Sequence, residues 1–362
     1  MKKTILFFLL ALTSLTKAQL PTVAQALWQE AWLNDSNAVM TCNAIGAQTI
    51  ATPDGNSFYV KWFPNGATPA NTPVIVTLHG SNGFAFHELI NWHNQAQLHG
   101  CGIISLQWYR GQNAVQPYDY FDDSALHNFI DSALTAINYP SGKAFLHGFS
   151  RGSARSYGII LNDILANNYF CTVLSNAGGA NPLYPLYAQI DSGNFGANVY
   201  AGKHWAMFCG GQDPTPTISG CPAMNDSKTW VEAKGATVDF FIQDPAADHD
   251  GFHFVPAYID SVLNYYLACY SGTISVKEES LQEIVLFPNP TNDQLSIQIP
   301  LKEKIESIII YNSIGQLVEK IKIETVNKNT EFTFSTANYK SGIYYLLIKT
   351  ETGILKKSFV KE

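Results

Sequence analysis

The chain has 362 residues, of which 46% are hydrophobic, which is enough for a substantial core and for more than one domain. Its formal net charge is −7. Residues 20–272 carry the acidic excess, whereas basic residues slightly outnumber acidic ones in residues 285–362. An acidic body without a basic stripe argues against nucleic acid as a partner.

The N-terminus has the order that is typical of a secretory signal peptide. Lys2 and Lys3 come before an apolar run from Ile5 to Leu12, and the small residue Ala18 follows. This apolar run is too short to span a bilayer. We therefore predict a signal peptide over residues 1–18, which is removed after Ala18 when the chain is exported.

All six cysteines lie in residues 20–272. An even number of cysteines in an exported chain favours disulfides, although buried free thiols in a large domain remain an alternative. Cys209 and Cys221 are close enough in the sequence to close one loop. No C-x-x-C pair is present, so the sequence does not indicate a structural zinc site.

Short apolar runs alternate with longer amphipathic stretches through residues 19–272. The runs predicted to be strands are TPVIVTLHG, GIISLQWYRG, GKAFLHG, TVLSNAGG, HWAMFCGG and ATVDFFIQD. The stretches predicted to be helices include HELINWHNQAQLHG, DDSALHNFIDSALTAI, ARSYGIILNDILANN and PAYIDSVLNYYLACY. This alternation predicts an α/β fold, in which a mainly parallel sheet has helices on both faces. Active sites of such sheets lie at the carboxyl ends of the strands.

The segment GFSRG, residues 148–152, places Ser150 between two glycines, after a predicted strand and before a predicted helix. Such a strand-to-helix turn exposes the serine hydroxyl and is so crowded that the flanking positions must be small. Gly148 and Gly152 meet that requirement. We therefore predict that Ser150 is a nucleophile.

A serine hydroxyl needs an adjacent base, and in this arrangement an acid and then a histidine follow the serine along the chain. Asp213 leaves the end of the predicted strand HWAMFCG and is the predicted acid. Asp244 and Asp248 are rival acids, but both lie on the histidine loop rather than on the preceding strand.

The base is expected in the loop PAADHDGFHF, between the sixth predicted strand and the last helix. His249 comes sooner after the strand and is followed by Asp250 and Gly251, which favour a turn. We therefore predict that His249 is the base. His253, in the same loop, is the alternative base.

Acyl transfer also requires backbone N–H groups that stabilise the negative charge on the carbonyl oxygen. The residue after the nucleophile supplies one of them, which assigns the N–H of Arg151. The second donor is expected in the loop LHGSNGF, residues 78–84, from the N–H of Ser81 or Asn82. An ordinary glycine turn is the alternative reading of this loop.

Aromatic residues are concentrated in QWYRGQNAVQPYDYFDD, residues 107–123, at a predicted strand end. Trp108, Tyr109, Tyr118 and Tyr120 are predicted to line the substrate cleft. Packing of these rings beneath the loop is the alternative.

No metal or cofactor is expected. The stretch that begins at His87 reads H-E-L-I-N and fails the H-E-x-x-H zinc pattern at its last position. Gly178 and Gly179 follow a predicted strand but lack the G-x-G-x-x-G spacing of a dinucleotide site.

The strand order, the HG loop, the G-x-S-x-G turn, the later Asp and the final His resemble the α/β-hydrolase superfamily over about residues 55–272. The short LHG loop is similar to that of secreted polyester depolymerases and feruloyl esterases. The Ser150–Arg151 pair resembles the G-x-S-R-x-G of glucuronoyl esterases, in which the Arg helps to bind the oxyanion. Here the second glycine, Gly152, comes one position earlier.

This resemblance implies an exported serine esterase that cleaves carboxylic esters through an acyl-enzyme and without a cofactor. Its substrate would be an ester, such as one carried by an extracellular polysaccharide or polyester. Two alternatives remain at this stage. One is a serine peptidase of the same fold, and the other is a homologue that only binds a polymer.

Beyond a polar stretch over residues 273–284, which we predict to be a linker, the composition changes. The alternating patterns QLSIQI, SIIIYN, EFTFST, YYLLIK and KKSFV predict a small all-β sandwich over residues 285–362. The segments LFPNPTNDQLSIQI, IIIYNSIGQLV and YKSGIYYLLIKTETGILKKSFVKE closely resemble the C-terminal sorting domain of type IX secretion substrates. The resemblance implies passage through the periplasm and outer membrane of a Bacteroidetes-type bacterium, with the type IX secretion machinery as partner.

Overall fold

The computed structural model describes residues 20–116, 118–182, 184–272, 285–299, 305–312, 317–322, 330–350 and 354–362. The predicted signal peptide and the predicted linker lie outside these residues. Among the described residues, no helix combines the length and the apolar character that crossing a bilayer would require.

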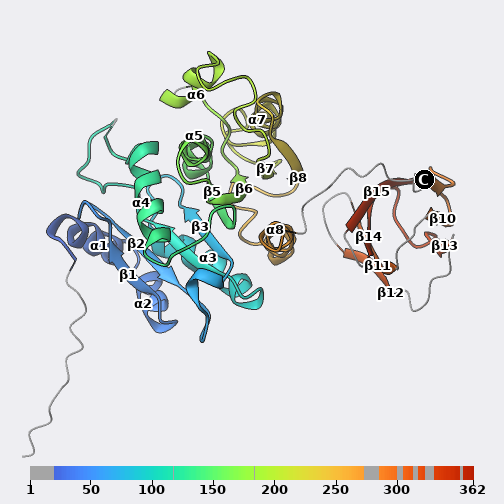
Figure 1. Ribbon diagram of the computed structural model, residues 1–362, viewed down its shortest axis with the longest axis horizontal. Helices are drawn as coiled ribbons and strands as arrows, with labels where there is room; N and C mark the ends of the chain where they lie inside the picture. Colours follow the sequence, from blue (N-terminus) through green and yellow to red (C-terminus); the bar gives the residue numbers. More distant parts are fainter. Residues whose placement is uncertain are drawn as a thin grey trace, which may run out of the picture.

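The body is built on one eight-stranded sheet in the order β1-β2-β4-β3-β5-β6-β7-β8 (Figure 1). Its strands are β1 (Gln48–Ala51), β2 (Phe58–Trp62), β3 (Val74–Leu78), β4 (Gly102–Leu106), β5 (Ala144–Phe149), β6 (Phe170–Asn176), β7 (His204–Gly210) and β8 (Thr237–Asp244). Strands β3 to β8 are parallel, and β1 and β2 pair antiparallel at one edge. All six predicted strands are present.

Helices cover both faces of this sheet. They are α1 (Thr22–Asn34), α2 (Ser36–Ala44), α3 (Ala85–Leu98), α4 (Asp123–Thr135), α5 (Arg151–Leu165), α6 (Pro185–Asp191), α7 (Cys221–Ala233) and α8 (Pro256–Tyr270), with a short 3₁₀ turn at Pro69–Asn71. Two separate cores result, one under α4, α5 and α7 and the other under α1, α2, α3 and α8. This arrangement is the α/β-hydrolase fold, as predicted.

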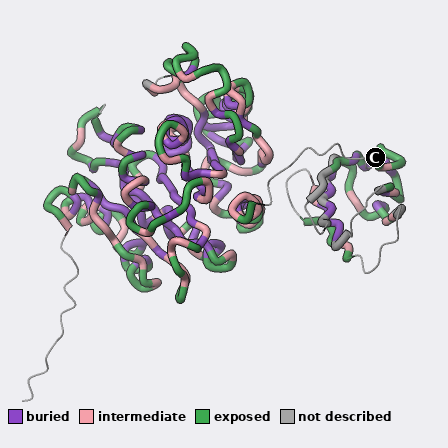
Figure 2. Tube along the Cα trace, in the orientation of Figure 1, coloured by how far each residue is buried: buried purple, intermediate pink, exposed green. Residues whose placement is uncertain are grey.

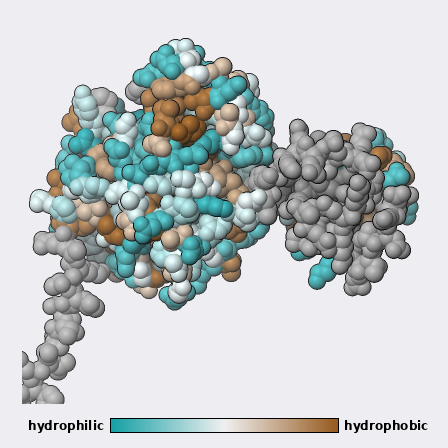
Figure 3. Space-filling model, viewed as in Figure 1, coloured by the Kyte–Doolittle hydropathy of each residue, from teal (hydrophilic) through white to brown (hydrophobic). Residues whose placement is uncertain are grey.

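Strand β3 illustrates why these sequences form central strands. Its sequence VIVTL is buried throughout. Val74, Val76 and Leu78 belong to one core and Ile75 to the other, because successive side chains of a strand point to opposite faces. A strand that is covered on both faces reads as a continuous apolar run, and Figure 2 shows such buried segments through the centre of the body. The face drawn in Figure 3 is a mixture of hydrophilic and hydrophobic residues, with one compact hydrophobic area near α5 and α6.

Residues 285–362 form two antiparallel sheets, in the orders β13-β10-β9 and β12-β11-β14-β15. The strands are β9 (Val285–Phe287), β10 (Gln294–Ile299), β11 (Ile305–Asn312), β12 (Leu317–Lys322), β13 (Thr330–Ser335), β14 (Gly342–Thr350) and β15 (Ile354–Lys361). Alternate residues such as Ile308 and Ile310 face a shared apolar core with Leu295 and Ile297 of the other sheet. The predicted all-β sandwich is confirmed.

The predicted Cys209–Cys221 pair forms a disulfide, and Cys171 and Cys269 form a second one. Cys42 and Cys101 are buried free thiols. Both expectations for the cysteines therefore hold in part, with four of them paired and two of them buried thiols. Since Cys209 belongs to β7 and Cys221 begins α7, their disulfide closes the loop that contains Asp213.

Removing the Cys209–Cys221 disulfide with the double substitution Cys209→Ala and Cys221→Ala is expected to lower the free energy of unfolding by about 3 kcal/mol, because the bond closes a short loop of the unfolded chain. Urea unfolding without reductant measures this loss. Cys101→Ala is the matched control, since it removes a buried sulfur that forms no cross-link. Equal losses in the two variants would contradict the cross-linking role.

Candidate active site

The turn between β5 and α5 holds Ser150 in a strained conformation. Its φ is 54° and its ψ is −118°, which is rare for a residue with a side chain. A Cβ atom on Gly148 would lie 2.3 Å from the carbonyl oxygen of Gly152, and one on Gly152 would lie 2.6 Å from that of Leu78. Both positions therefore require glycine. The packing of this turn exposes the Ser150 hydroxyl above the carboxyl end of the sheet.

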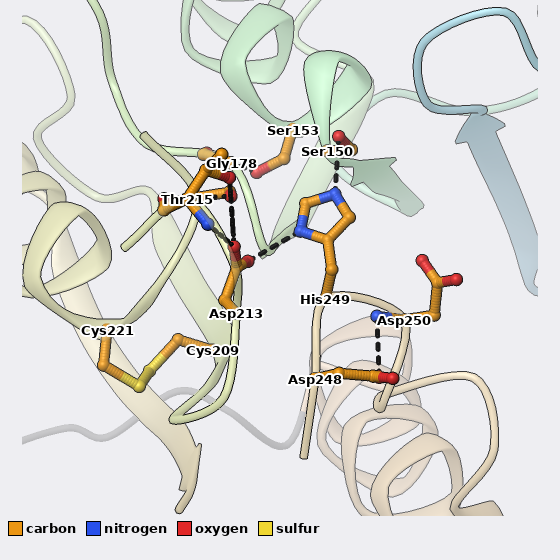
Figure 4. Close-up of polar contacts among 11 residues, drawn as sticks. Ser150, Ser153, Gly178, Cys209, Asp213, Thr215, Cys221, Asp248, His249 and Asp250 are labelled. Atoms are coloured by element: carbon orange, nitrogen blue, oxygen red, sulfur yellow. Dashed lines mark hydrogen bonds and ion pairs between the residues drawn. A yellow bond between two sulfur atoms is a disulfide. The ribbon is translucent and has the colours of Figure 1, made fainter. Parts of the chain in front are cut away.

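Ser150, His249 and Asp213 form a continuous hydrogen-bonded chain (Figure 4). His249 Nε2 lies 2.8 Å from Ser150 Oγ, and His249 Nδ1 lies 2.6 Å from Asp213 Oδ2. A carboxylate can only accept, so Nδ1 carries the proton and Nε2 accepts the hydroxyl of Ser150. These three residues come from the ends of β5, β7 and β8, which the parallel sheet brings to one edge.

The Asp213 side chain is almost wholly buried, with 1% of its surface exposed. Its second oxygen, Oδ1, accepts hydrogen bonds from the backbone N–H of Thr215 at 2.8 Å, from the Thr215 hydroxyl at 3.0 Å and from the Ser219 hydroxyl at 2.9 Å. Burial disfavours the charged form, but the hydrogen bonds that the carboxylate accepts, first of all from His249, outweigh it. The pKa of Asp213 therefore lies below its usual value.

The supporting residues Thr215 and Ser219 were not predicted. The sequence does contain a signal for Thr215. An Asp side chain often accepts the backbone N–H of the residue two positions later in an Asx turn, and Thr215 is two positions after Asp213. Ser219 reaches the carboxylate only through the course of the loop, which no local pattern indicates.

The substitution Asp213→Asn is expected to lower kcat for ester hydrolysis by about 10⁴-fold, because an amide donates to Nδ1 and so favours the wrong tautomer of His249. Steady-state kinetics on a p-nitrophenyl ester measures the effect. Asn has the same shape as Asp, so the variant should remain folded and differ from the wild type only in kcat. A variant that loses activity because it is unfolded would contradict the orienting role.

Two backbone N–H groups near Ser150 are candidate oxyanion donors. Arg151 is the first residue of α5, and its N–H has no acceptor within the helix. The loop after β3 packs against Ser150, since a Cβ on Gly80 would lie 3.2 Å from the Cβ of Ser150. The N–H of Asn82, one of the two predicted donors in this loop, is already bound to the hydroxyl of Tyr120 at 2.7 Å. Ser81 is therefore the better candidate for the second donor.

An open cleft of about 390 Å³ lies beside Ser150. It is lined by His79, Gly80, Ser81, Gly83, His87, Glu88, Asn91, Phe149, Ser150, His249, Asp250, His253 and Phe254. Polar side chains such as His87 and Asn91 line it together with the rings of Phe149 and Phe254, and the Phe254 ring is exposed at the surface. The cleft can therefore contact both polar and apolar parts of a substrate.

The prediction that Trp108, Tyr109 and Tyr120 line the cleft is wrong, because all three are buried and packed under the loop. Trp108 has no exposed surface, and its indole N–H donates to the carbonyl oxygen of His79 at 2.9 Å. Tyr109 packs against Tyr120. Tyr118 is 71% exposed but does not belong to the cleft lining. The alternative, aromatic packing beneath the loop, describes this segment.

His253 also lines the cleft, but its side chain contacts Glu88 rather than Ser150. Its Nε2 is 3.5 Å from Glu88 Oε2, and no hydrogen-bond partner for this nitrogen is found among the described residues. Glu88 also lies 3.6 Å from Nδ1 of His147. His249, not its rival His253, is therefore the histidine that contacts Ser150.

The cluster of Glu88, His147 and His253 has ligand types that could hold a cation. However, the indole N–H of Trp92 donates to His147 Nδ1 at 3.0 Å and occupies the lone pair that a metal would need. His147 Nδ1 is therefore not free to bind a cation together with Glu88 and His253.

Residues 285–362 match the family described as the secretion system C-terminal sorting domain. The tail is a C-terminal sorting domain. This confirms the predicted type IX sorting signal, and the sorting domain marks the chain for export to the cell surface or beyond.

The solved structures similar to this chain include three esterases. A carboxylesterase from Bacillus cereus is 14% identical with a TM-score of 0.43, covering 64% of this chain and 99% of that one. An esterase from Pyrobaculum calidifontis is 14% identical with a TM-score of 0.47, over 70% and 94% of the two chains. An esterase from Rhizomucor miehei is 12% identical with a TM-score of 0.48, over 66% and 90%. No curated protein matches the chain in sequence.

Proposed function

We propose that the chain is an exported serine hydrolase that cleaves carboxylic esters through an acyl-enzyme. Residues 19–272 would be the catalytic domain, joined by residues 273–284 to the sorting domain. The observation that carries the proposal is the chain of two short hydrogen bonds from Ser150 through His249 to Asp213, at 2.8 and 2.6 Å. Nucleophile, base and orienting group stand in the order and at the distances that covalent catalysis needs.

In the proposed mechanism, the Ser150 oxygen attacks the carbonyl carbon of the ester while His249 Nε2 takes the hydroxyl proton. The tetrahedral oxyanion is bound by the N–H groups of Arg151 and Ser81. His249 then gives its proton to the leaving alcohol, and the acyl group stays on Ser150. A water molecule, deprotonated by His249, releases the acid by the same route. Asp213 keeps Nδ1 protonated and stabilises the imidazolium that forms.

The substrate is proposed to be an ester that the enzyme meets outside the cell, since the sorting domain marks the chain for export. The cleft is open and has both polar and apolar lining residues, which supports an ester that combines polar and apolar groups, such as a polysaccharide ester. No cofactor takes part in any step of this mechanism.

A fluorophosphonate probe and a substrate panel test the proposal. We expect the purified chain to be labelled covalently and to hydrolyse p-nitrophenyl esters much faster than peptide p-nitroanilides. Faster hydrolysis of the anilides would favour a peptidase. A folded chain that is neither labelled nor active would favour a protein that only binds a polymer, and would overturn the proposal.

A further inference from the structure

The loop that carries the proposed oxyanion donor Ser81 contains a strained residue. The φ of Asn82 is 56°, in the left-handed region, which a side chain adopts only when its surroundings hold it there. Its backbone N–H donates to the hydroxyl of Tyr120 at 2.7 Å. The same hydroxyl donates to Asn82 Oδ1 at 3.4 Å. One hydroxyl therefore holds both the backbone and the side chain of the residue next to Ser81.

The ring of Tyr120 is itself held firmly. It is 5% exposed and packs against Trp108 and Tyr109, with ring centroids 4.5 and 5.1 Å away. The guanidinium carbon of Arg151 lies 3.7 Å from the ring centroid, within the range of a cation–π contact. The guanidinium also pairs with Asp119, 3.5 Å away. The ring of Tyr120 is therefore fixed by its neighbours, while its hydroxyl fixes the loop that contains Asn82.

These contacts connect two separate parts of the chain. Arg151 begins α5 and supplies the first proposed oxyanion donor through its backbone, while Ser81 supplies the second from the loop after β3. Two donors stabilise one oxygen only if their separation is kept within a few tenths of an ångström. The path from Arg151 through Tyr120 to Asn82 is the link that can set this separation.

We propose that Tyr120 is a positioning residue for the oxyanion hole, and that the Arg151 side chain clamps it in place. This inference rests on the proposed function. The neighbouring carboxylate of Asp119 balances the charge of Arg151, and the ring of Tyr120 covers one side of the guanidinium. Both contacts favour an internal role of this side chain over the binding of an anionic substrate.

The variant Tyr120→Phe tests the proposal, because it keeps the ring and its contact with Arg151 and removes only the hydroxyl. We expect kcat on p-nitrophenyl butyrate to fall by about 10- to 100-fold, with KM within about threefold of the wild type. The affinity for a trifluoromethyl ketone, which forms a tetrahedral adduct, should fall by about the same factor as kcat/KM. Active sites are counted by fluorophosphonate titration, so that kcat refers to folded enzyme.

Tyr139→Phe is the matched control. Its hydroxyl likewise accepts a backbone N–H, that of Val74 at 3.1 Å, but at the opposite end of β3. We expect this variant to lose stability and to keep its kcat per labelled site. Equal effects of the two substitutions on kcat, or an unchanged kcat in Tyr120→Phe, would overturn the positioning role. A wild-type chain that the probe does not label would overturn the proposed function itself, and this inference with it.

The clamp is tested with Arg151→Met and Arg151→Lys. We expect the first to lower kcat on the neutral ester by about tenfold, and the second to recover part of that loss, because it keeps a cation near the ring. An effect of Arg151→Met that is confined to the KM of an anionic ester would show that Arg151 binds substrate, and would overturn its role as a clamp.

Discussion

Replacing Ser150 by alanine is expected to lower kcat for ester hydrolysis by about 10⁶-fold and to abolish covalent labelling by a fluorophosphonate. The hydroxyl is the atom that would form the acyl-enzyme, and no other group is placed to replace it within reach of His249 among the described residues. A residual rate of about 10³-fold over the uncatalysed reaction should remain, because the oxyanion donors and the cleft are left intact. Stopped assays with high enzyme concentration can measure this residual rate.

Ser141→Ala is the matched control for this prediction. Ser141 is an exposed serine just before β5, at the end of the strand opposite Ser150. This variant should be labelled and active like the wild type. Labelling that persists in Ser150→Ala would mean that another residue is the nucleophile, and would contradict the mechanism.

The second large effect is expected from His249→Ala, which should lower kcat by about 10⁵-fold or more. Without the imidazole, no group takes the proton from Ser150 or returns it to the leaving alcohol. Because the residues act as a unit, the double variant Ser150→Ala and His249→Ala should be no slower than Ser150→Ala alone. Additive losses in the double variant would indicate that the two side chains act independently.

His253→Ala in the same loop separates the two candidate bases. The His253 side chain is 5% exposed and faces Glu88, so its removal should lower stability through lost packing. We expect kcat per labelled site to stay within about tenfold of the wild type. Full activity in His249→Ala, together with a large loss in His253→Ala, would reverse the assignment.

Much of the fold could be predicted because its signals are local. The six central strands are apolar runs that end in turn residues, and the helices between them are amphipathic. The edge strands β1 and β2 were not predicted. Strand β1 pairs with β2, and β2 in turn pairs with β4, so both strands depend on contacts with other segments of the chain.

The chemistry of the candidate site was predictable in part for the same reason. The turn from Gly148 to Gly152 is recognisable in the sequence because its crowding requires glycine on both sides of Ser150. A parallel sheet brings the carboxyl ends of its strands to one edge, so Asp213 and a histidine of the last loop were expected beside Ser150. The sequence favoured His249 over His253 as the base but did not exclude His253. They are four residues apart in one loop, and only the course of that loop decides which ring contacts Ser150.

The aromatic segment after β4 shows where reasoning from the sequence fails. An aromatic ring at a strand end can face the cleft or the core, and the local sequence does not indicate which of the two it faces. In the structure Trp108 is in the core, while Tyr120 connects the loop of Asn82 with Arg151. These contacts join three segments that are distant in the chain, so no local pattern encodes them.

The sequence by itself therefore determined the alternation of strands and helices, the Gly-flanked turn, the export signal of the sorting domain and the order of Ser, Asp and His. Each of these depends on spacing and on local backbone sterics. Only the tertiary structure decided which histidine contacts the serine, which N–H groups remain available beside it, and which of the cysteines pair. Those outcomes depend on distances between segments that are far apart in the chain. Tertiary packing determines these distances, and the spacing of residues along the sequence does not.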